Sequence, residues 1–247
     1  MSALDPHAAA SIRGLIVPPM PTYFTDASFR FLRALARHNE RAWFQAHKAD
    51  YETHVRAPFQ RLLTDLQPAL ASISPHYRAD PKPLGGSLFR IQRDTRFAND
   101  KSPYKTWQGA RLFHARGRQV EAPSFYLHLQ PGECFVGAGL WHPQPDTLRR
   151  VRHFLLDNPG GWRAAAHAPA FRKRFDLDDS ETLARIPRGF PADSEFADDL
   201  RRRNFVAFRA LDDATMTGPR LRTMLEADLA ALAPFVDYLC AALDLEF

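Results

Sequence analysis

The sequence predicts an α+β fold, in which a mainly antiparallel sheet of about five strands is packed by N-terminal and C-terminal helices. Apolar residues recur at helical spacing near both ends of the chain, the pattern of amphipathic helices. Between residues 88 and 140 apolar residues alternate with others, and the predicted strands follow one another directly. That succession argues against a doubly wound sheet, because parallel strands need crossover helices between them.

Residues 1–23, rich in alanine and proline, predict a flexible arm, and residues 24–247 predict a single α+β domain. The domain begins with three predicted helices. Their apolar positions are Phe31, Leu32 and Leu35, then Trp43, Phe44, His47, Tyr51 and Val55, and then Leu62, Leu66 and Leu70 after an opening Pro58. These stripes predict that the helices pack against the sheet.

A densely charged stretch, residues 89–97, is predicted to be a strand. Side chains alternate between strand faces, which places Phe89, Ile91, Arg93 and Thr95 on one face and Arg90, Gln92, Asp94 and Arg96 on the other. Phe89 and Ile91 mark the first face as buried. Arg93 is therefore expected to be partly buried and to need a carboxylate partner.

The second face of this stretch keeps an excess of positive charge, because Asp94 cannot neutralise both Arg90 and Arg96. A polar turn at residues 99–103 then brings Tyr104 and further cations near the end of the strand. The predicted anion-binding cluster is Arg90, Arg93, Arg96, Lys101 and Lys105. A salt-bridge lattice and a solvated run of charge are the alternative interpretations.

The clearest local structure is a hairpin. Residues 124–130 and 133–140 alternate on either side of a turn at Pro131 and Gly132, and residues 107–114 predict a preceding strand. The expected register pairs Gln130 with Glu133, His128 with Phe135, Tyr126 with Gly137 and Ser124 with Gly139. The opposite face is then wholly apolar and consists of Phe125, Leu127, Leu129, Cys134, Val136, Ala138 and Leu140.

On the other face of the hairpin, Tyr126 and His128 stand beside Gly137 and Gly139, which have no side chains to fill the space. Glycine in a strand often marks the close approach of a ligand or of another backbone. With Trp141 at its edge, this face predicts a trough that holds either a ligand or a helix. His128 is a candidate catalytic base, and a hydrogen-bonded structural histidine is the alternative.

The C-terminal part predicts a helix that begins near Asp146, an irregular segment at residues 183–191, a strand at residues 204–211 and a long helix after Pro219. In the first of these helices, Arg149, Arg150 and Arg152 are predicted to be solvated, opposite the apolar stripe.

The run Arg90-x-x-Arg93-Asp94-x-Arg96-Phe97, followed by Asp100-Lys101-x-x-Tyr104-Lys105, resembles the signature of the "domain of unknown function 2461" family. Similar motifs are Trp43-Phe44, Tyr126-x-His128, Gly139-x-Trp141-x-Pro143 and Pro187-Arg188-Gly189-Phe190. The resemblance extends from about residue 24 to the C-terminus. It implies no particular activity, because the function of that family is not established.

Several classes of protein lack support in the sequence. Cys134 and Cys240 are far apart, which argues against a disulfide framework or a zinc ribbon and favours a reducing compartment. The histidines include no H-E-x-x-H pair, a site from Glu133, His128 and His142 has no supporting spacing, and no dinucleotide fingerprint occurs. We therefore expect no metal and no cofactor. Without a signal peptide or an apolar stretch of about 20 residues, we expect a cytoplasmic protein that does not enter the membrane.

The resulting hypothesis is a binding protein for a phosphate- or carboxylate-bearing ligand. The net charge of +5 gives it little support, because 28 of the basic residues are Arg and only 5 are Lys, a skew that commonly reflects GC-rich coding. A nucleic acid is a less supported ligand, because the nearby aromatic residues are expected to be buried. An enzyme acting on an anionic small molecule or nucleotide is the second hypothesis, with Tyr104, Tyr126, His128 and Asp94 as candidate proton-transfer residues. A structural salt-bridge core, with a protein-interaction function on another surface, is the third.

Overall fold

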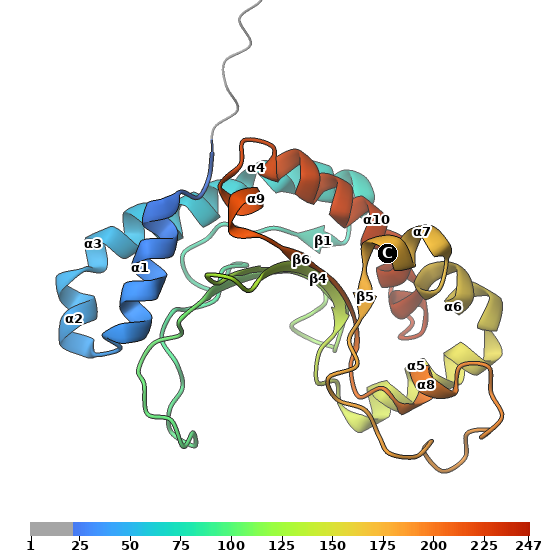
Figure 1. Ribbon diagram of the computed structural model, residues 1–247. Coiled ribbons are helices and arrows are strands. Elements are labelled where there is room, and N and C mark those ends of the chain that lie inside the picture. Colours follow the sequence, from blue (N-terminus) through green and yellow to red (C-terminus); the bar gives the residue numbers. More distant parts are fainter. Residues whose placement is uncertain (1–21) are drawn as a thin grey trace, which may run out of the picture.

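The computed structural model describes residues 22–247, which form an arched sheet with helices along one face and at both ends (Figure 1). The elements in chain order are α1 (Asp26–Arg37), α2 (Arg41–Ala46), α3 (Lys48–Tyr51), the π-helical turn η1 (Glu52–Arg56), α4 (Ala57–Ile73), β1 (Tyr77–Arg78), β2 (Gln108–His114), β3 (Ser124–Leu129), β4 (Cys134–Leu140), α5 (Pro145–Asp157), α6 (Pro159–Ala166), α7 (Pro169–Arg174), β5 (Asp176–Leu177), α8 (Ala197–Arg201), β6 (Phe205–Leu211), α9 (Asp213–Thr217) and α10 (Leu221–Ala241).

The strands form one six-stranded antiparallel sheet in the order β1-β2-β3-β4-β6-β5. This architecture confirms the predicted α+β class. Four of the five predicted strands are present, as β2, β3, β4 and β6, and the two-residue edge strands β1 and β5 bring the count to six. Such short segments carry too little alternation to be detected in a sequence.

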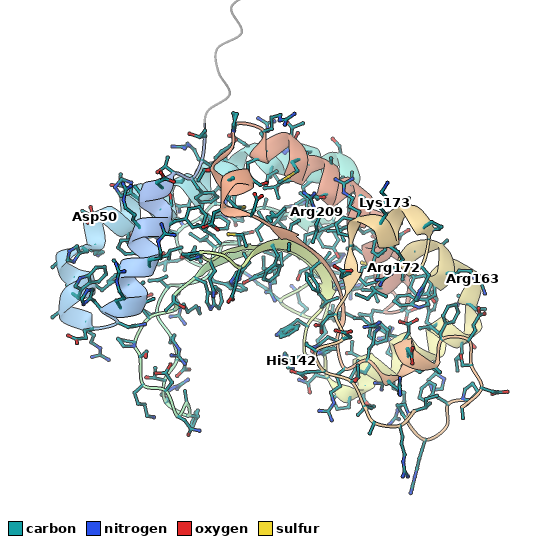
Figure 2. The ribbon with its side chains drawn as sticks, viewed as in Figure 1. Asp50, His142, Arg163, Arg172, Lys173 and Arg209 are labelled. Atoms are coloured by element: carbon teal, nitrogen blue, oxygen red, sulfur yellow. The ribbon has the colours of Figure 1, made fainter. Side chains whose placement is uncertain are left out.

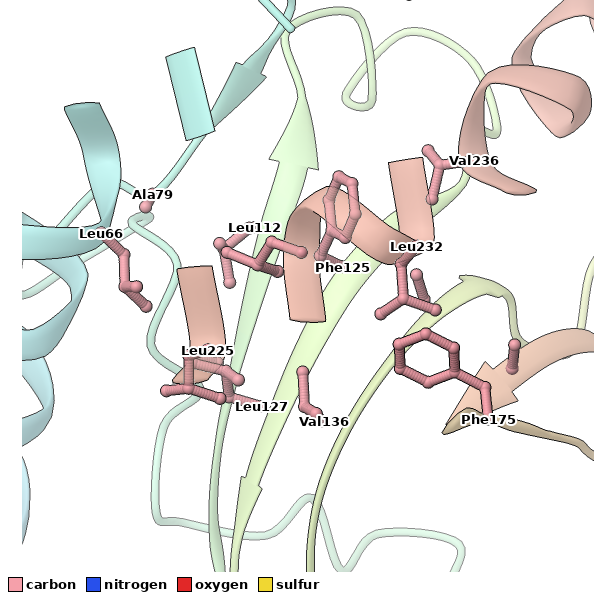
Figure 3. Close-up of a cluster of buried hydrophobic side chains, with 14 of the residues drawn as sticks. Leu66, Ala79, Leu112, Phe125, Leu127, Val136, Phe175, Leu225, Leu232 and Val236 are labelled. Atoms are coloured by element: carbon pink, nitrogen blue, oxygen red, sulfur yellow. The ribbon is translucent and has the colours of Figure 1, made fainter. Parts of the chain in front are cut away.

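The hydrophobic core lies between the convex face of the sheet and the paired helices α4 and α10 (Figure 3). Its members come from both layers and include Leu66 of α4, Leu112 of β2, Phe125 and Leu127 of β3, Val136 of β4, and Leu225, Leu232 and Val236 of α10, all buried. Burying such side chains is worth roughly 1.5–3 kcal/mol each, which makes this layer the main source of stability.

A buried ion-paired group fixes α10 against its neighbours. Asp228 of α10 is fully buried and accepts from Arg174 of α7 at 2.8 Å and from Arg209 of β6 at 2.7 Å. Figure 2 shows Arg209 close to α10. Because each partner satisfies one carboxylate oxygen, the buried charge is matched on both sides.

The predicted hairpin register is confirmed. Ser124 pairs with Gly139, Tyr126 with Gly137 and His128 with Phe135, and the face predicted to be apolar is buried in the core. A slip of one residue would have moved every apolar side chain to the other face, which is why the alternation specifies the register.

The prediction of a strand at residues 89–97 is wrong. The stretch makes one isolated bridge, Gln92 with Tyr104, and is otherwise a loop; the bridge of Leu88 with Ala110 lies just before it. Side-chain oxygens compete for the backbone donors that a strand would use: Asp94 accepts from the Arg96 amide, and Asp100 accepts from that of Ser102. Such local bonds turn the chain away from the sheet ladder.

Of the predicted arm, residues 1–21 lie outside the described residues. Tyr23, at its end, is buried and donates its hydroxyl to Asp65 of α4. Among residues 22–247, no helix has the length and apolar character needed to cross a bilayer.

The glycines of β4 accommodate the backbone of β6. A Cβ at Gly139, whose φ is +135°, would lie 1.9 Å from the carbonyl oxygen of Phe205, and one at Gly137 would lie 2.7 Å from that of Ala207. The close neighbour foreseen from these glycines is therefore a backbone. No helix covers this concave face of the sheet in the described part of the chain (Figure 1).

We predict that Gly139→Ala lowers the free energy of unfolding by about 2–4 kcal/mol, because it adds both a strained positive φ and a steric clash. Gly160→Ala is the control: a Cβ there meets nothing within 4 Å, and alanine in α6 should raise stability by about 0.5–1 kcal/mol. Urea denaturation measures both changes. Equal stability of the Gly139 variant and the wild type would contradict the close pairing of β4 with β6.

Candidate functional site

The basic stretch forms a loop, residues 89–105, that projects from the open side of the sheet beside α1 and α2 (Figure 1). Asn39 holds this loop: its side-chain amide donates to the Tyr104 carbonyl at 2.9 Å and accepts from the Tyr104 amide at 3.0 Å. The buried Tyr104 ring stacks on Phe44 of α2 with centroids 4.1 Å apart. Tyr104 therefore anchors the loop to the N-terminal helices.

A cleft of about 480 Å³, here called the Lys105 cleft, opens between the loop and the end of α1. The structure brings four of the predicted site residues together in its lining, namely Arg93, Asp94, Tyr104 and Lys105. The other members of the predicted cluster, Arg90, Arg96 and Lys101, belong to the same loop but do not line the cleft.

Two of the predicted cations have carboxylate partners within the loop. Arg93 pairs with Asp100, which fulfils the expectation that it is partly buried and matched, and Arg96 pairs with Asp94 at 2.6 Å. Hydrogen bonds from Arg96 lower the pKa of Asp94, and those from Ser102 and Arg93 lower that of Asp100. Both carboxylates are thus ionised, and each is already paired with an arginine. Because the pairs are open to solvent, they shape the loop more than they stabilise the fold.

Lys105 differs from these residues, because no carboxylate of residues 22–247 lies within ion-pair distance of its ammonium group. The Lys105 Nζ donates to the Arg90 carbonyl at 2.6 Å and stands over the rings of Trp107 and Phe89, 5.2 and 5.8 Å from their centroids. Burial lowers the pKa of Lys105, and the nearby Arg90 and Arg93 lower it further. The residue is a half-buried cation in a locally positive environment.

Arg90 and Lys101 add to this surplus. Within the described part of the chain neither makes an ion pair, and the Lys101 Nζ donates only to the Thr95 carbonyl at 3.0 Å. The loop therefore holds five cations and two carboxylates, with both carboxylates already paired.

On the concave face, His128 belongs to a chain of hydrogen bonds. The Gln130 amide nitrogen donates to Glu133 at 2.7 Å, so the Gln130 oxygen faces His128 Nε2 at 3.1 Å, and Nε2 must carry the proton. His128 Nδ1 then accepts from the Tyr126 hydroxyl at 3.0 Å. Both ring nitrogens are occupied by protein groups, which favours the structural interpretation of His128.

The environment of this chain also disfavours proton transfer near neutral pH. Burial raises the pKa of Tyr126 above its ordinary range, and burial lowers that of His128 against smaller opposing effects of Gln130 and Glu133. The His128 ring stacks on Phe135 with centroids 4.7 Å apart. Trp141, predicted to edge a trough here, is 61% exposed beyond the end of β4.

A second cleft, of about 440 Å³, was missed from the sequence and is here called the Arg152 cleft. The prediction that Arg152 is solvated is wrong, since it is only 7% exposed. A signal was present: position 152 lies four residues after Leu148 and three before Leu155, on the apolar stripe of α5. Figure 2 shows His142, which lines this cleft, on the concave side of the molecule.

A metal site is not formed by the described residues 22–247. No group of three or more histidine, cysteine or acidic side chains gathers there in a way that could hold an ion. Cys134 and Cys240 are free and buried, and burial raises the pKa of each thiol to about 11.

We predict that the His128 ring is neutral and protonated at Nε2 at neutral pH, with the imidazolium forming only below the ordinary value of 6.5. Nitrogen-15 NMR of the ring across a pH titration measures both properties. Tyr126→Phe should shift the Nδ1 resonance by removing its hydrogen-bond donor. A titration midpoint above the ordinary value would restore His128 as an accessible acid–base candidate.

Residues 27–238 match the model of a family described as a conserved hypothetical protein (DUF2461). Neither the curated proteins nor the solved structures with which the chain was compared gave a match. The matched range covers most of the chain and contains the residues of both clefts. The chain therefore belongs to the DUF2461 family, as its motifs predicted.

Proposed function

We propose that this protein is a cytoplasmic binding protein for a small anionic molecule, which places a phosphate or carboxylate group in the Lys105 cleft. The observation that carries the proposal is Lys105 itself: a half-buried ammonium group without a carboxylate partner among residues 22–247, in a cleft beside Arg90 and Arg93. The free, buried cysteines fit a reducing compartment.

The energetic argument concerns the unmatched charge. Burial removes water from Lys105, and the two neighbouring guanidiniums repel its positive form. An anionic group in the cleft would relieve both costs at once and would accept a charge-assisted hydrogen bond from Nζ. Asp94 and Asp100 compete weakly, because each is already bonded to an arginine.

The dimensions fit a small molecule. Ligand clefts commonly measure about 300–1,000 Å³, a range that includes this one at about 480 Å³. The rings of Phe89 and Trp107 flank the ammonium group, and Trp107, which lines the cleft, offers apolar surface to an organic body. The expectation that the aromatic residues near the basic stretch are buried is wrong for Phe97, which is 94% exposed. A single-stranded nucleic acid still fits less well, because it needs successive exposed aromatic platforms along a basic groove, and Phe89 and Tyr104 of the same loop are not exposed.

An enzyme acting on such a molecule is the second candidate. The observation that favours it is again Lys105, because a lysine with a lowered pKa has more of the neutral amine that acts as a nucleophile or base. Conversion of the bound ligand on incubation would identify the cleft as an active site.

We predict that Lys105→Met weakens the binding of an anionic metabolite by roughly ten- to a hundredfold, the equivalent of a charge-assisted hydrogen bond. A thermal-shift panel of phosphorylated and carboxylated metabolites would find the ligand, and titration calorimetry would compare affinities. Lys173→Met is the matched control, because Lys173 is an exposed lysine on α7 (Figure 2). Equal loss in the two variants, or no loss in either, would exclude this cleft.

We also predict that affinity falls as the pH rises from neutral toward 10.5, the ordinary lysine value. The sign follows from the lowered pKa of Lys105: the ammonium group loses its proton before an ordinary lysine does, and the neutral amine no longer attracts the anion. Lys105→Arg should bind without this fall, because a guanidinium stays charged. Calorimetric titrations at several pH values test both proteins, and identical profiles would contradict the role of Lys105.

A further inference from the structure

The Arg152 cleft is lined by residues of α5 and of the segment that precedes α8. These elements lie at the end of the molecule opposite the 89–105 loop (Figure 1). The walls of the cleft are α5, the irregular segment between β5 and α8, and the residues that lead into β6. The segment is held against that lead by main-chain bonds, from Leu183 to the Arg201 carbonyl at 2.8 Å and from Arg203 to the Glu181 carbonyl at 3.1 Å. The cleft is thus formed by three stretches distant in sequence.

Arg152 is the central feature of this cleft. Its Nη2 donates to the Arg202 carbonyl at 2.8 Å, but its buried Nε has no hydrogen-bond partner. No carboxylate of residues 22–247 pairs with it, and burial lowers its pKa. A guanidinium in such a position is costly to keep in the free protein, because no carboxylate of the described residues offsets its lost hydration.

The nearby carboxylates are committed to other arginines. Asp199 accepts from Arg202 at 2.9 Å, and Asp198 from Arg201 at 2.6 Å. The carboxylate that lines the cleft is Glu181, which lies 3.5 Å from His142 Nε2.

The cleft also brings three further guanidinium groups to Arg152. Arg149, Arg188 and Arg203 are exposed and line the same space. Four guanidiniums against one carboxylate leave a formal surplus of +3. The Lys105 cleft, in contrast, has two cations and two carboxylates in its lining.

Apolar groups complete the site. Leu148, Leu183 and Phe190 line the cleft, and the Phe190 ring packs on His153 with centroids 4.8 Å apart. A ligand that matches this lining has a strongly anionic end and an apolar or aromatic body. Guanidinium groups bind phosphate through paired N–H bonds, and a phosphate dianion offsets more of the surplus than a carboxylate does.

We propose that the Arg152 cleft is a second anion site, which binds a phosphate monoester of an apolar or aromatic compound through Arg152. A phosphate oxygen accepts the hydrogen bond that the buried Arg152 guanidinium otherwise lacks. The other phosphate oxygens face Arg149, Arg188 and Arg203. The site shares no lining residue with the Lys105 cleft and is independent of it.

The test is titration calorimetry with phenyl phosphate, benzoate and inorganic phosphate in a buffer free of phosphate and sulfate. The full chain carries Lys105→Met, so that the first cleft does not contribute. We expect phenyl phosphate to bind at least about tenfold more tightly than benzoate, and Arg152→Met to weaken that binding by about tenfold or more. Arg172→Gln is the control, because Arg172 is exposed on α7, away from the cleft (Figure 2).

Arg188→Ala and Arg203→Ala decide the matter if Arg152→Met fails to fold, because both side chains are exposed and their removal spares the core. Each should weaken phenyl phosphate binding by about threefold or more, while Arg172→Gln leaves it unchanged. The proposal is overturned by equal affinity in all variants, by equal affinity for benzoate, or by the absence of saturable phenyl phosphate binding.

Discussion

The arrangement of this protein depends on the covering of only one face of its sheet by helices. Helices α4 and α10 cover the convex face and exclude water from it, and the buried pairing of Asp228 with Arg174 and Arg209 holds α10 there. The concave face must therefore satisfy its own polar groups. A chain of side-chain hydrogen bonds does so, linking Tyr126, His128, Gln130 and Glu133. These polar groups are therefore bonded to one another. Lys105 and Arg152, which have no carboxylate partner among residues 22–247, lie instead in the clefts at the two ends of the arch, where we propose that ligands bind.

The parts of the fold that the sequence predicts are those in which burial selects one pattern. In the hairpin, alternation separates an apolar face from a mixed one, and only one register keeps Phe125, Leu127 and Val136 together in the core. The long C-terminal helix is equally predictable, because its apolar residues recur at helical spacing. Edge strands of two residues and the π-helical turn leave no comparable pattern, since too few side chains are involved.

The candidate sites were less predictable, for a physical reason in each case. Residues 89–97 alternate as a strand does, yet the side chains of Asp94 and Asp100 take local backbone donors and release the stretch as a loop. The sequence still identified the cations and the excess of charge, because composition does not depend on whether the stretch is a strand or a loop. Arg152 lies on the apolar stripe of α5, which hints at its burial, but the cleft around it depends on residues 181–203, which reach it only in the folded chain.

The two clefts differ in the electrostatic environment that an anion would meet. In the Lys105 cleft the ion pairs of the loop are open to water and cost little, so the unfavourable charge is confined to Lys105, which is only half-buried. Arg152 is buried between α5 and the segment that precedes α8, and no carboxylate of residues 22–247 pairs with it, so its charge is unfavourable in the free protein. An apolar side chain at position 152 would give the fold at least equal stability. The retention of Arg152 therefore supports a ligand more directly than the cations of the 89–105 loop do. A ligand of the Arg152 cleft must also match both its shape and its surplus of positive charge more closely.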